Sequence, residues 1–465
     1  MPETSIDALP KSIFRAYDIR GVVGETLNSE IMQSIGQAIG SEARSLGNTK
    51  IAVGRDGRLS GPQLSKALIE GLLMSGIDVI DLGRVPTPVL YFATHVLEGV
   101  SSGVMLTGSH NPVNHNGAKI VLNHQALAGE QIEKLYQRIL NLDFTTGEGH
   151  LTKLDIISEY IATIKKDVTV KRPLKVVVDS GNGIAGLVAP TLLRELGCDV
   201  YELHCEVDGH FPNHHPDPSQ MENLQDLIQM VCQKKADIGL AFDGDGDRLG
   251  VVTSKGDVIW PDRQLILYAL DILKRTPGAT IIYDVKSTRH LATQIEANGG
   301  KPLMYCTGHS LVKGKIRETG ALLGGEMSGH MFFNDRWYGF DDALYTAARL
   351  LEILSHDERD PDAVFAEIPE DVSTPELRIH MHDDAKFDFM KKLVESSRFD
   401  GDAQINTIDG LRVDFPDGWG LVRASNTTPF LVVRFEADDE KALQRIQNQF
   451  RQCLLSLDAD LKLPF

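Results

Sequence analysis

The chain has 465 residues, a formal net charge of −18 and an apolar share of 42%. This length predicts about three or four domains, and the ordinary globular composition excludes a largely disordered chain. The negative charge argues against a general nucleic-acid-binding protein, because such proteins rely on a basic surface for most of their affinity.

Neither cysteine usage nor hydropathy indicates export or a membrane partner. The five cysteines are too scattered for a disulfide framework, and none forms a C-x-x-C metal pair. The first 14 residues lack the basic start and apolar core of a signal peptide, and no run of about 18 apolar residues predicts a membrane span. We therefore expect a protein of the reducing cytoplasm with no membrane partner.

Three stretches of the chain share one pattern. Each begins with a short buried strand that ends in a polar loop, continues with an amphipathic helix, and reaches a second strand after a glycine. A third strand then ends in a glycine-rich loop. The first strands span 50–56, 175–179 and 280–284, the second strands span 76–80, 197–201 and 300–304, and the third strands with their loops span 103–112, 238–248 and 321–330.

This repeat predicts three similar α/β domains, each with a mostly parallel or mixed sheet. Because ligands bind at strand ends in such sheets, we expect the three loops to face one shared central cleft. In the first helix, Ser60 is the predicted N-cap and Pro62 lies in the opening turn. The predicted core face of this helix contains Leu64, Ala67, Leu68 and Leu72.

The C-terminal part of the chain follows a different pattern. Residues 411–415 and part of 430–436 alternate apolar with polar side chains, with a predicted turn at 416–420 between them. A helix with Leu443, Ile446, Phe450 and Leu454 on one face follows, so we expect a smaller α+β domain with an antiparallel sheet. The charged, proline-containing region 356–375 is the predicted boundary. The expected domains are 1–155, 156–256, 257–370 and 371–465.

The loop 107–112, with the sequence TGSHNP, places a serine beside a histidine at a strand end. Adjacent side chains need not touch, so Ser109 and His110 are not identified as a nucleophile and its base by position alone. The nucleophile elbow G-x-S-x-G is absent, because Thr107 and Asn111 stand where it needs glycine. Taken alone, this loop is as compatible with a turn role for Ser109 as with a catalytic one.

The segment 181–186 matches G-x-G-x-x-G after a strand, and Glu202 follows at a distance suited to a ribose contact. This match favours an NAD-dependent oxidoreductase. The equivalent turns of the other two repeats lack the pattern, however, so a structural glycine turn is the preferred interpretation.

Asp243, Asp245 and Asp247 alternate with glycine in the sequence DGDGDR. In an extended segment every second side chain points the same way, so the three carboxylates can converge on one hard cation. An oxygen-rich set of this kind suits Mg²⁺. An EF-hand is the competing interpretation, but Ser254 stands where it needs a glutamate. An acidic surface turn is the simplest alternative, and the mutual repulsion of the carboxylates argues against it.

Two further loops carry groups suited to a sugar phosphate. The segment 326–330 combines a carboxylate, a hydroxyl and an imidazole that can hydrogen-bond vicinal sugar hydroxyls, with a helix cap as the alternative. The segment 423–429 combines a guanidinium with hydroxyls in a turn. Such a turn suits a phosphate dianion, with a solvated turn as the alternative.

Together these motifs resemble the α-D-phosphohexomutase superfamily over nearly the whole chain, and they are most similar to its bacterial phosphomannomutase/phosphoglucomutase branch. The matching segments, in the family's order, are YDIRG at 17–21, TGSHNP at 107–112, NGAK at 116–119, DGDGDR at 243–248, Lys286, TGH at 307–309, GEMSGH at 325–330 and RASNTTP at 423–429. The resemblance implies a heart-shaped arrangement of four domains, which agrees with the repeat.

The resemblance also implies the reaction and its residues. It implies an enzyme that interconverts hexose 1-phosphates and hexose 6-phosphates of mannose and glucose through a phosphoserine, with hexose 1,6-bisphosphate as intermediate and activator and Mg²⁺ as cofactor. The implied catalytic residues are Ser109, Arg20, Lys119, Arg248, His309 and His330. The implied substrate-binding residues are Tyr17, Lys286, Glu326, Ser328, Arg423, Ser425, Asn426 and Thr427. The implied metal ligands are Ser109, Asp243, Asp245 and Asp247.

In the expected mechanism, phosphoserine 109 passes its phosphoryl group to a free sugar hydroxyl, and the bisphosphate turns over and returns its other phosphate. The proton of the sugar hydroxyl needs a base and an acid, for which the candidates are Lys119, Arg20, His309 and His330. We expect a monomer whose partners are hexose phosphates. The rival hypotheses are an NAD-dependent oxidoreductase and a sugar-phosphate- or Ca²⁺-binding protein without turnover.

Overall fold

The computed structural model describes residues 9–426 and 428–465 of the chain. Within these residues the strands form four sheets that follow one another along the sequence. The first three sheets mix parallel and antiparallel strands, whereas the last is antiparallel. The predicted fold class, three similar α/β domains followed by a smaller α+β domain, is confirmed.

The N-terminal domain contains a sheet of order β1-β5-β4-β2-β3-β7, in which β6 pairs with β5. Its strands are β1 (Ile19–Val22), β2 (Lys50–Arg55), β3 (Asp78–Arg84), β4 (Gly103–Leu106), β5 (His115–Leu122), β6 (Gln125–Ala126) and β7 (Leu151–Lys153). Its helices are α1 (Ser29–Ser45), α2 (Gly61–Met74), α3 (Thr87–Val96) and α4 (Glu130–Leu140), preceded by the short 3-10 helix η2 (Lys11–Ile13).

The second domain contains a sheet of order β12-β11-β10-β8-β9. Its strands are β8 (Lys175–Asp179), β9 (Asp199–Leu203), β10 (Ile238–Phe242), β11 (Leu249–Thr253) and β12 (Val258–Ile259). Its helices are α5 (Ile157–Asp167), η3 (Ile184–Leu187), α6 (Ala189–Glu195), η4 (Met221–Leu224) and α7 (Gln225–Lys234).

The third domain contains a sheet of order β14-β13-β15-β16. Its strands are β13 (Thr280–Asp284), β14 (Lys301–Tyr305), β15 (Leu323–Gly325) and β16 (Met331–Phe333). Its helices are α8 (Pro261–Arg275), α9 (His290–Ala297), α10 (His309–Thr319), α11 (Ala343–His356) and α12 (Pro361–Phe365).

The three repeats share one strand arrangement, and this positions their loops. The first and third strands of each repeat lie side by side and parallel, as in β2 with β4, β8 with β10, and β13 with β15. The next strand of each repeat, β5, β11 or β16, runs antiparallel beside the third. The loops after β4, β10 and β15 therefore leave their sheets at equivalent positions.

The C-terminal domain contains a sheet of order β17-β22-β21-β20-β19, in which β18 also pairs with β22. Its strands are β17 (Val372–Ser373), β18 (Leu377–His380), β19 (Gln404–Asn406), β20 (Leu411–Phe415), β21 (Gly418–Ala424) and β22 (Phe430–Ala437). Its helices are α13 (Asp383–Ser396) and α14 (Glu440–Leu457), and the predicted core face of α14 is buried.

One local prediction was wrong. The predicted turn at 416–420 is shorter, because Gly418, Trp419 and Gly420 already belong to β21. Here glycine serves close packing, since a Cβ atom on Gly420 would lie 2.5 Å from the ring of Phe450. The predicted N-cap position of Ser60 is confirmed, although its hydroxyl accepts a hydrogen bond from Asn116 Nδ2 at 2.9 Å instead of making a cap bond.

Buried side chains divide the molecule differently from its sheets. One large apolar core runs from Ala52 and α3 of the N-terminal domain through the second and third domains to Ile368. A second core fills the other side of the N-terminal sheet, and the C-terminal domain has a core of its own. The C-terminal domain meets the third mainly through a small cluster of Val285, Trp419 and Leu421 and a set of buried polar contacts.

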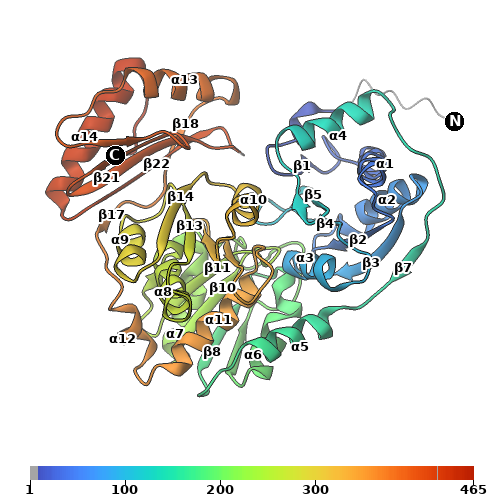
Figure 1. The fold of residues 1–465 in the computed structure, drawn as a ribbon, viewed down its shortest axis with the longest axis horizontal. Helices are drawn as coiled ribbons and strands as arrows, with labels where there is room; N and C mark the ends of the chain where they lie inside the picture. The colour runs from blue at the N-terminus through green and yellow to red at the C-terminus, as the bar shows by residue number, and fades with distance from the viewer. Residues whose placement is uncertain (1–8, 427) are drawn as a thin grey trace.

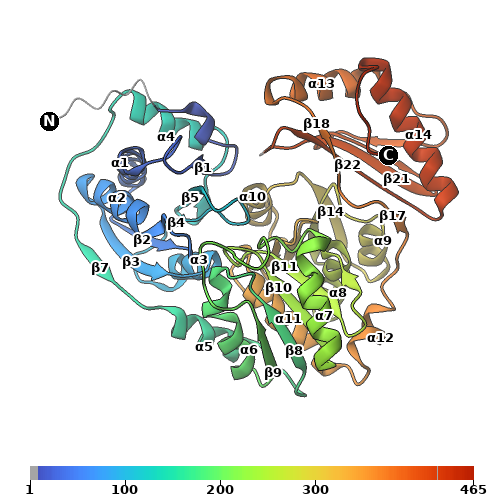
Figure 2. The same cartoon turned by 180° about the vertical axis from the view of Figure 1, so that it is seen from behind.

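Figures 1 and 2 show how the domains are arranged. The C-terminal domain, in red, lies beside the third domain and across from the N-terminal domain, in blue, while the second and third domains form the middle of the molecule. Among the described helices, none is both long enough and apolar enough to span a bilayer.

Candidate active site

Ser109 lies in the loop after β4 and faces the second domain. Its backbone has a positive φ of 47°, and its side chain is 2% exposed. The hydroxyl donates to Asp243 Oδ2 at 2.9 Å and lies 3.1 Å from His110 Nδ1. The adjacent serine and histidine therefore do touch, and the serine also reaches the aspartate loop of another domain.

Asp56 and Arg58, which lie in the loop after β2, hold the Ser109 loop in place through hydrogen bonds. The Asp56 carboxylate accepts hydrogen bonds from Thr107 Oγ1 and Gly108 N, at 2.8 and 3.1 Å. The Arg58 guanidinium donates to the carbonyl oxygens of Ser109, Asn111, Pro112 and His115 at 2.6–2.9 Å. Neither residue was predicted, although the charged loop after the first strand of the repeat was a signal for them.

The three carboxylates after β10 converge, with one oxygen of each lying within 4.8 Å of the others. The expected reason was wrong, because the segment is a turn with Gly246 at a φ of 79° rather than an extended strand. Asp243, Asp245 and Asp247 are all fully buried. Burial and the two neighbouring carboxylates raise the pKa of Asp243 well above its usual range.

The donor set fits a hard divalent cation. Asp245 Oδ1 is buried and has no hydrogen-bond partner among the described residues, whereas the buried Asp247 Oδ1 faces His330 Nε2 at 3.4 Å. Asp243 Oδ1 accepts three backbone N–H groups, while its Oδ2 faces the Ser109 hydroxyl. Unpaired carboxylate oxygens in a dry site are costly, and a cation bound by oxygen ligands would satisfy them.

Lys119, on β5, neutralises part of this charge. Its ammonium lies 2.7 Å from Asp245 Oδ2 and also pairs with Asp247 Oδ2. Although burial favours the neutral amine, the two carboxylates hold the pKa of Lys119 well above its usual range. Arg20 Nη2, on β1, pairs with Asp18 Oδ2 at 2.5 Å. The sheet of the N-terminal domain thus brings Lys119 to the carboxylate cluster, while Arg20 pairs within its own domain.

His330 joins the third domain to the same cluster. Its Nε2 lies 3.2 Å from Arg248 Nε and 3.4 Å from Asp247 Oδ1. Its Nδ1 lies 2.9 Å from both Ser328 Oγ and Glu326 Oε2. Burial opposes the charged form, but Asp247 raises the pKa of His330 to about 9.

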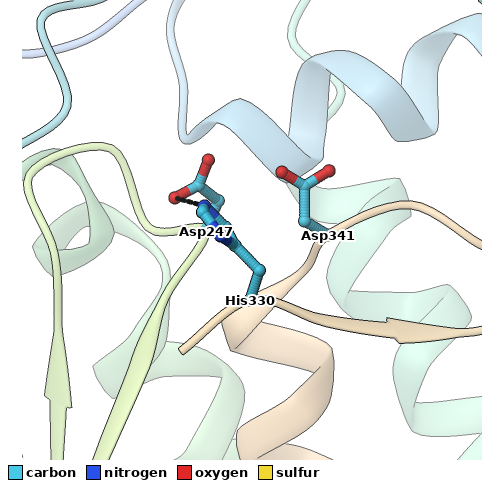
Figure 3. Close-up of side chains that lie close together, drawn as sticks. All are labelled: Asp247, His330 and Asp341. Atoms are coloured by element: carbon cyan, nitrogen blue, oxygen red, sulfur yellow. Dashed lines mark ion pairs between the residues drawn. The ribbon is translucent and has the colours of Figure 1, made fainter. Parts of the chain in front are cut away.

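Asp341 lies beside this ion pair, as Figure 3 shows. One of its oxygens accepts a hydrogen bond from Lys313 Nζ at 2.7 Å, and the other lies 3.6 Å from His309 Nδ1. Burial, with Lys313 and Lys119 nearby, lowers the pKa of His309 well below its usual range. The two imidazoles, whose ring centroids are 5.6 Å apart, thus differ in charge.

A second group of predicted residues gathers where the C-terminal domain meets the others. Tyr17 OH donates to Thr307 O at 3.1 Å and accepts a hydrogen bond from Asn426 Nδ2. Gly308 packs so tightly on Tyr17 that an added Cβ would lie 2.8 Å from its ring. The Ser425 hydroxyl accepts hydrogen bonds from Thr428 N and Oγ1. Thr427, which was also predicted here, lies outside the described residues.

Lys286 and Arg423, the two predicted cations of this group, are almost fully buried. Lys286 Nζ lies 2.9 Å from Glu376 Oε2, and Arg423 Nε lies 3.0 Å from Asp409 Oδ2. Neither carboxylate was singled out in the sequence, because each belongs to a segment with no recognisable pattern. The structure thus separates a reactive end around Ser109 from a second, cation-lined end.

The glycine-rich loop 181–186 has a structural role, because its glycines lie close to neighbouring backbone. Gly181 and Asn182 both have positive φ, and the loop runs into the short η3 rather than an α-helix. A Cβ atom on Gly186 would lie 2.0 Å from Cys205 O, and one on Gly183 would lie 3.0 Å from the Cα of Gly244 in the carboxylate loop. Glu202 pairs with Arg194 at 2.7 Å. These contacts support the structural turn over a nucleotide site.

Comparison with protein families matches four successive models along the chain. They are described as phosphoglucomutase/phosphomannomutase alpha/beta/alpha domains I, II and III and C-terminal domain, and they match residues 11–146, 158–256, 260–372 and 376–452.

Similar proteins cover the whole length of the chain. A phosphomannomutase/phosphoglucomutase of Pseudomonas aeruginosa is 57% identical over 465 residues, which cover 100% of both chains. A phosphoglucomutase of Neisseria meningitidis is 52% identical over 451 residues, covering 96% of this chain and 98% of its own. A crystal structure of a phosphoglucomutase/phosphomannomutase family protein from Burkholderia thailandensis matches with a TM-score of 0.94 and 53% identity, over 98% of this chain and 100% of that one.

Proposed function

This chain belongs to the phosphoglucomutase/phosphomannomutase family, and we propose that its cleft interconverts the 1-phosphates and 6-phosphates of glucose and mannose. It is an intramolecular phosphotransferase, like the relatives that share more than half of its residues. The observation that carries the proposal is the Ser109 hydroxyl, which is held 2.9 Å from a buried carboxylate of a converging triad.

The proposed reaction consists of two transfers at Ser109. The P–O bond of phosphoserine 109 breaks as a new P–O bond forms to the free hydroxyl of a hexose 1- or 6-phosphate. The resulting hexose 1,6-bisphosphate turns over in the cleft and returns its other phosphate to the Ser109 oxygen. Phosphoryl transfer of this kind depends mostly on positioning and on charge stabilisation, which the clamp of Asp56 and Arg58 and the cations Arg248 and Lys119 support.

Each transfer moves one proton as well as one phosphoryl group. In the first transfer the attacking sugar hydroxyl loses its proton and the departing serine oxygen gains one; in the second transfer the serine hydroxyl loses its proton and the departing sugar oxygen gains one. The groups proposed to exchange these protons are Arg20, Lys119, His309 and His330. The different charge states of the two histidines are consistent with this exchange.

We propose that Mg²⁺ is bound by Asp243, Asp245 and Asp247 together with an oxygen of phosphorylated Ser109. The buried Asp245 Oδ1, which has no hydrogen-bond partner among the described residues, supports this assignment. When bound, the cation offsets negative charge on the phosphoryl group.

The sugar is proposed to lie between the two ends of the cleft. Glu326 and Ser328 would hold the sugar's 3- and 4-hydroxyls, which glucose and mannose share, so both sugars should be accepted. The non-reacting phosphate would be held by Tyr17, Lys286, Arg423, Ser425, Asn426 and Thr427. We further propose that the enzyme acts in the cytoplasm as a monomer.

The test is turnover of glucose 1-phosphate with a catalytic amount of glucose 1,6-bisphosphate. The wild-type enzyme should produce glucose 6-phosphate and lose this activity in EDTA. Intact-protein mass spectrometry should show a phosphate adduct on the wild type and none on Ser109→Ala, which should still bind substrate. An adduct that persists on the alanine variant would show that another residue carries the phosphoryl group.

A further inference from the structure

Both cations proposed to hold the non-reacting phosphate already have a negative partner. The Lys286 ammonium pairs with Glu376, just before β18, and the Arg423 guanidinium pairs with Asp409, just before β20. Both carboxylates belong to the C-terminal domain. Lys286 is 6% exposed and Arg423 is 5% exposed, whereas the side chains of Glu376 and Asp409 are 32% and 16% exposed, so water reaches each pair from the carboxylate side.

These pairs are ionised. Burial favours the uncharged form of Glu376, but Lys286 lowers the pKa of this carboxyl below its usual range. Burial likewise opposes the charge on Lys286 and Arg423, but Glu376 raises the pKa of the amine and Asp409 that of the guanidinium. Each of the two cations thus faces a carboxylate of its own, and Asp284 and Arg378 act on the same groups from nearby.

We propose that Glu376 and Asp409 limit the affinity of the cleft for phosphate, so that a phosphate group binds by competing with built-in carboxylates for Lys286 and Arg423. This inference rests on the proposed function. Each carboxylate repels an arriving phosphate through a medium of low effective dielectric and already satisfies the cation that would attract it. The binding free energy of the phosphate is reduced by both effects.

The proposed reaction gives a reason for this weakening. The bisphosphate must release one phosphate from the cation-lined end, turn over and bind there again by its other phosphate. A site that held phosphate tightly would slow each turn, because energy gained equally in every bound state does not speed the chemical step. If the carboxylates pair with the cations again when the phosphate leaves, they lower the barrier to exchanging one phosphate of the bisphosphate for the other.

Glu376 is the cleaner of the two positions to test. Among the described residues, its carboxylate makes no hydrogen bond except the one with Lys286. Asp409 Oδ2 also accepts a hydrogen bond from Thr307 N at 2.9 Å, so it positions a loop of the third domain as well. A glutamine at 376 preserves the size of the side chain and an oxygen acceptor while it removes the charge.

The experiment compares the wild type with Glu376→Gln and with Asp402→Asn as a matched control. Asp402 is an exposed carboxylate of the same domain, so its substitution changes the net charge equally. We expect Glu376→Gln to lower KM for glucose 1-phosphate and glucose 6-phosphate, and the inhibition constant of inorganic phosphate, by roughly three- to ten-fold. We expect kcat to fall as well, because the bisphosphate turns more slowly, and we expect the control to match the wild type.

A KM or phosphate inhibition constant that is unchanged or raised would overturn the inference, since a carboxylate that merely positions Lys286 would weaken binding when removed. If Glu376→Gln does not fold, Asp409→Asn is the second variant, because its amide oxygen can still accept the Thr307 N–H and the same decreases are expected. A wild type without mutase turnover would refute the proposed function instead, and inhibition constants would then be replaced by calorimetric titration with inorganic phosphate.

Discussion

At the scale of single residues, the position of Ser109 depends on a buried cation that is not among the residues proposed to touch substrate. Arg58 is 1% exposed and gathers four carbonyl oxygens of the serine loop around one planar guanidinium. Lysine has the same charge but cannot match this fork of donors. Arg58 should therefore matter for geometry rather than for charge.

We expect Arg58→Lys to lower kcat by about 10–100-fold with little change in KM, because misplacing a reacting group by a fraction of an ångström is costly. The fraction of enzyme phosphorylated on Ser109, measured by mass spectrometry, should fall in parallel. Arg55→Lys, on the preceding strand and half-exposed, is the matched control and should behave like the wild type. A normal kcat in Arg58→Lys would show that the Asp56 contacts suffice to hold the loop.

The contrast between Asp243 and Arg58 shows what the sequence can reveal about the site. Asp243, Asp245 and Asp247 are neighbours in the chain, so their convergence was visible in the spacing of the residues. Arg58 contacts carbonyl groups 51–57 residues away, and backbone acceptors leave no trace in residue types. Glu376 could not be found for a similar reason, because Lys286 lies 90 residues away, and Asp409 belongs to a segment without a recognisable pattern.

At the scale of elements, the start of α11 carries a buried carboxyl that ties it to α5. Asp342 caps the helix by accepting a hydrogen bond from Tyr345 N, and both of its oxygens lie 2.8 Å from Tyr160 OH. Trp337 Nε1 donates to the same group at 3.1 Å. Burial nevertheless raises the pKa of Asp342 from 3.8 to about 7.

This pKa predicts a pH-dependent stability. The folded state binds the Asp342 proton more tightly than the unfolded chain, so the stabilisation is fully present below about pH 4 and is lost as the pH rises through 7. An asparagine at this position would keep the cap without a charge. The Tm of Asp342→Asn relative to the wild type should therefore rise by about 2–4 °C between pH 5 and pH 8.

Asp360→Asn provides the matched control for this prediction. Asp360 caps α12 through Ala363 N in the same way, but it is exposed. Its Tm relative to the wild type should change little between the same two pH values. An Asp342→Asn variant whose relative Tm is equally flat would show that the Asp342 carboxyl is ionised at both pH values.

Helices and strands could be predicted where apolar residues followed a clear pattern. Segments with glycine were harder to predict, because glycine occurs both in turns and where backbones pack closely. The strands at 175–179 and 280–284 match β8 and β13 because their apolar runs are short and end at polar loops. The segment 416–420 was misread because glycine in a sequence suggests a turn, whereas Gly418 and Gly420 let β21 pack closely on Glu436 and Phe450. Only the partner elements distinguish these two uses of glycine.

At the scale of the whole molecule, Tyr17 is the residue at which three domains meet. It comes from the N-terminal domain, donates to Thr307 O of the third domain and accepts from Asn426 of the C-terminal domain. The C-terminal domain has a separate core, so its position over the rest of the molecule depends on interdomain contacts such as these and the buried cluster of Val285, Trp419 and Leu421. The region near residue 370 is proposed to act as its hinge.

We expect Tyr17→Phe to increase the release of hexose 1,6-bisphosphate into solution by about 3–10-fold relative to turnover, since a ring without its hydroxyl makes neither hydrogen bond. The measurement is the amount of free bisphosphate formed per glucose 6-phosphate produced. Tyr136→Phe, on α4 of the same domain, is the control and should release no more than the wild type. Equal release from both variants would show that other contacts keep the cleft closed.

The unequal division of the interior also has a consequence for synthesis of the chain on the ribosome. The core of Ile13 to Ile139 is complete once the N-terminal domain has emerged. The large core, by contrast, includes Val364, Phe365 and Ile368 and therefore remains open until nearly four-fifths of the polypeptide has been made. Its unfinished apolar surface is exposed through most of translation, when nascent chains are vulnerable to aggregation. A chaperone that binds this nascent chain should therefore dissociate only after residue 368 has left the exit tunnel.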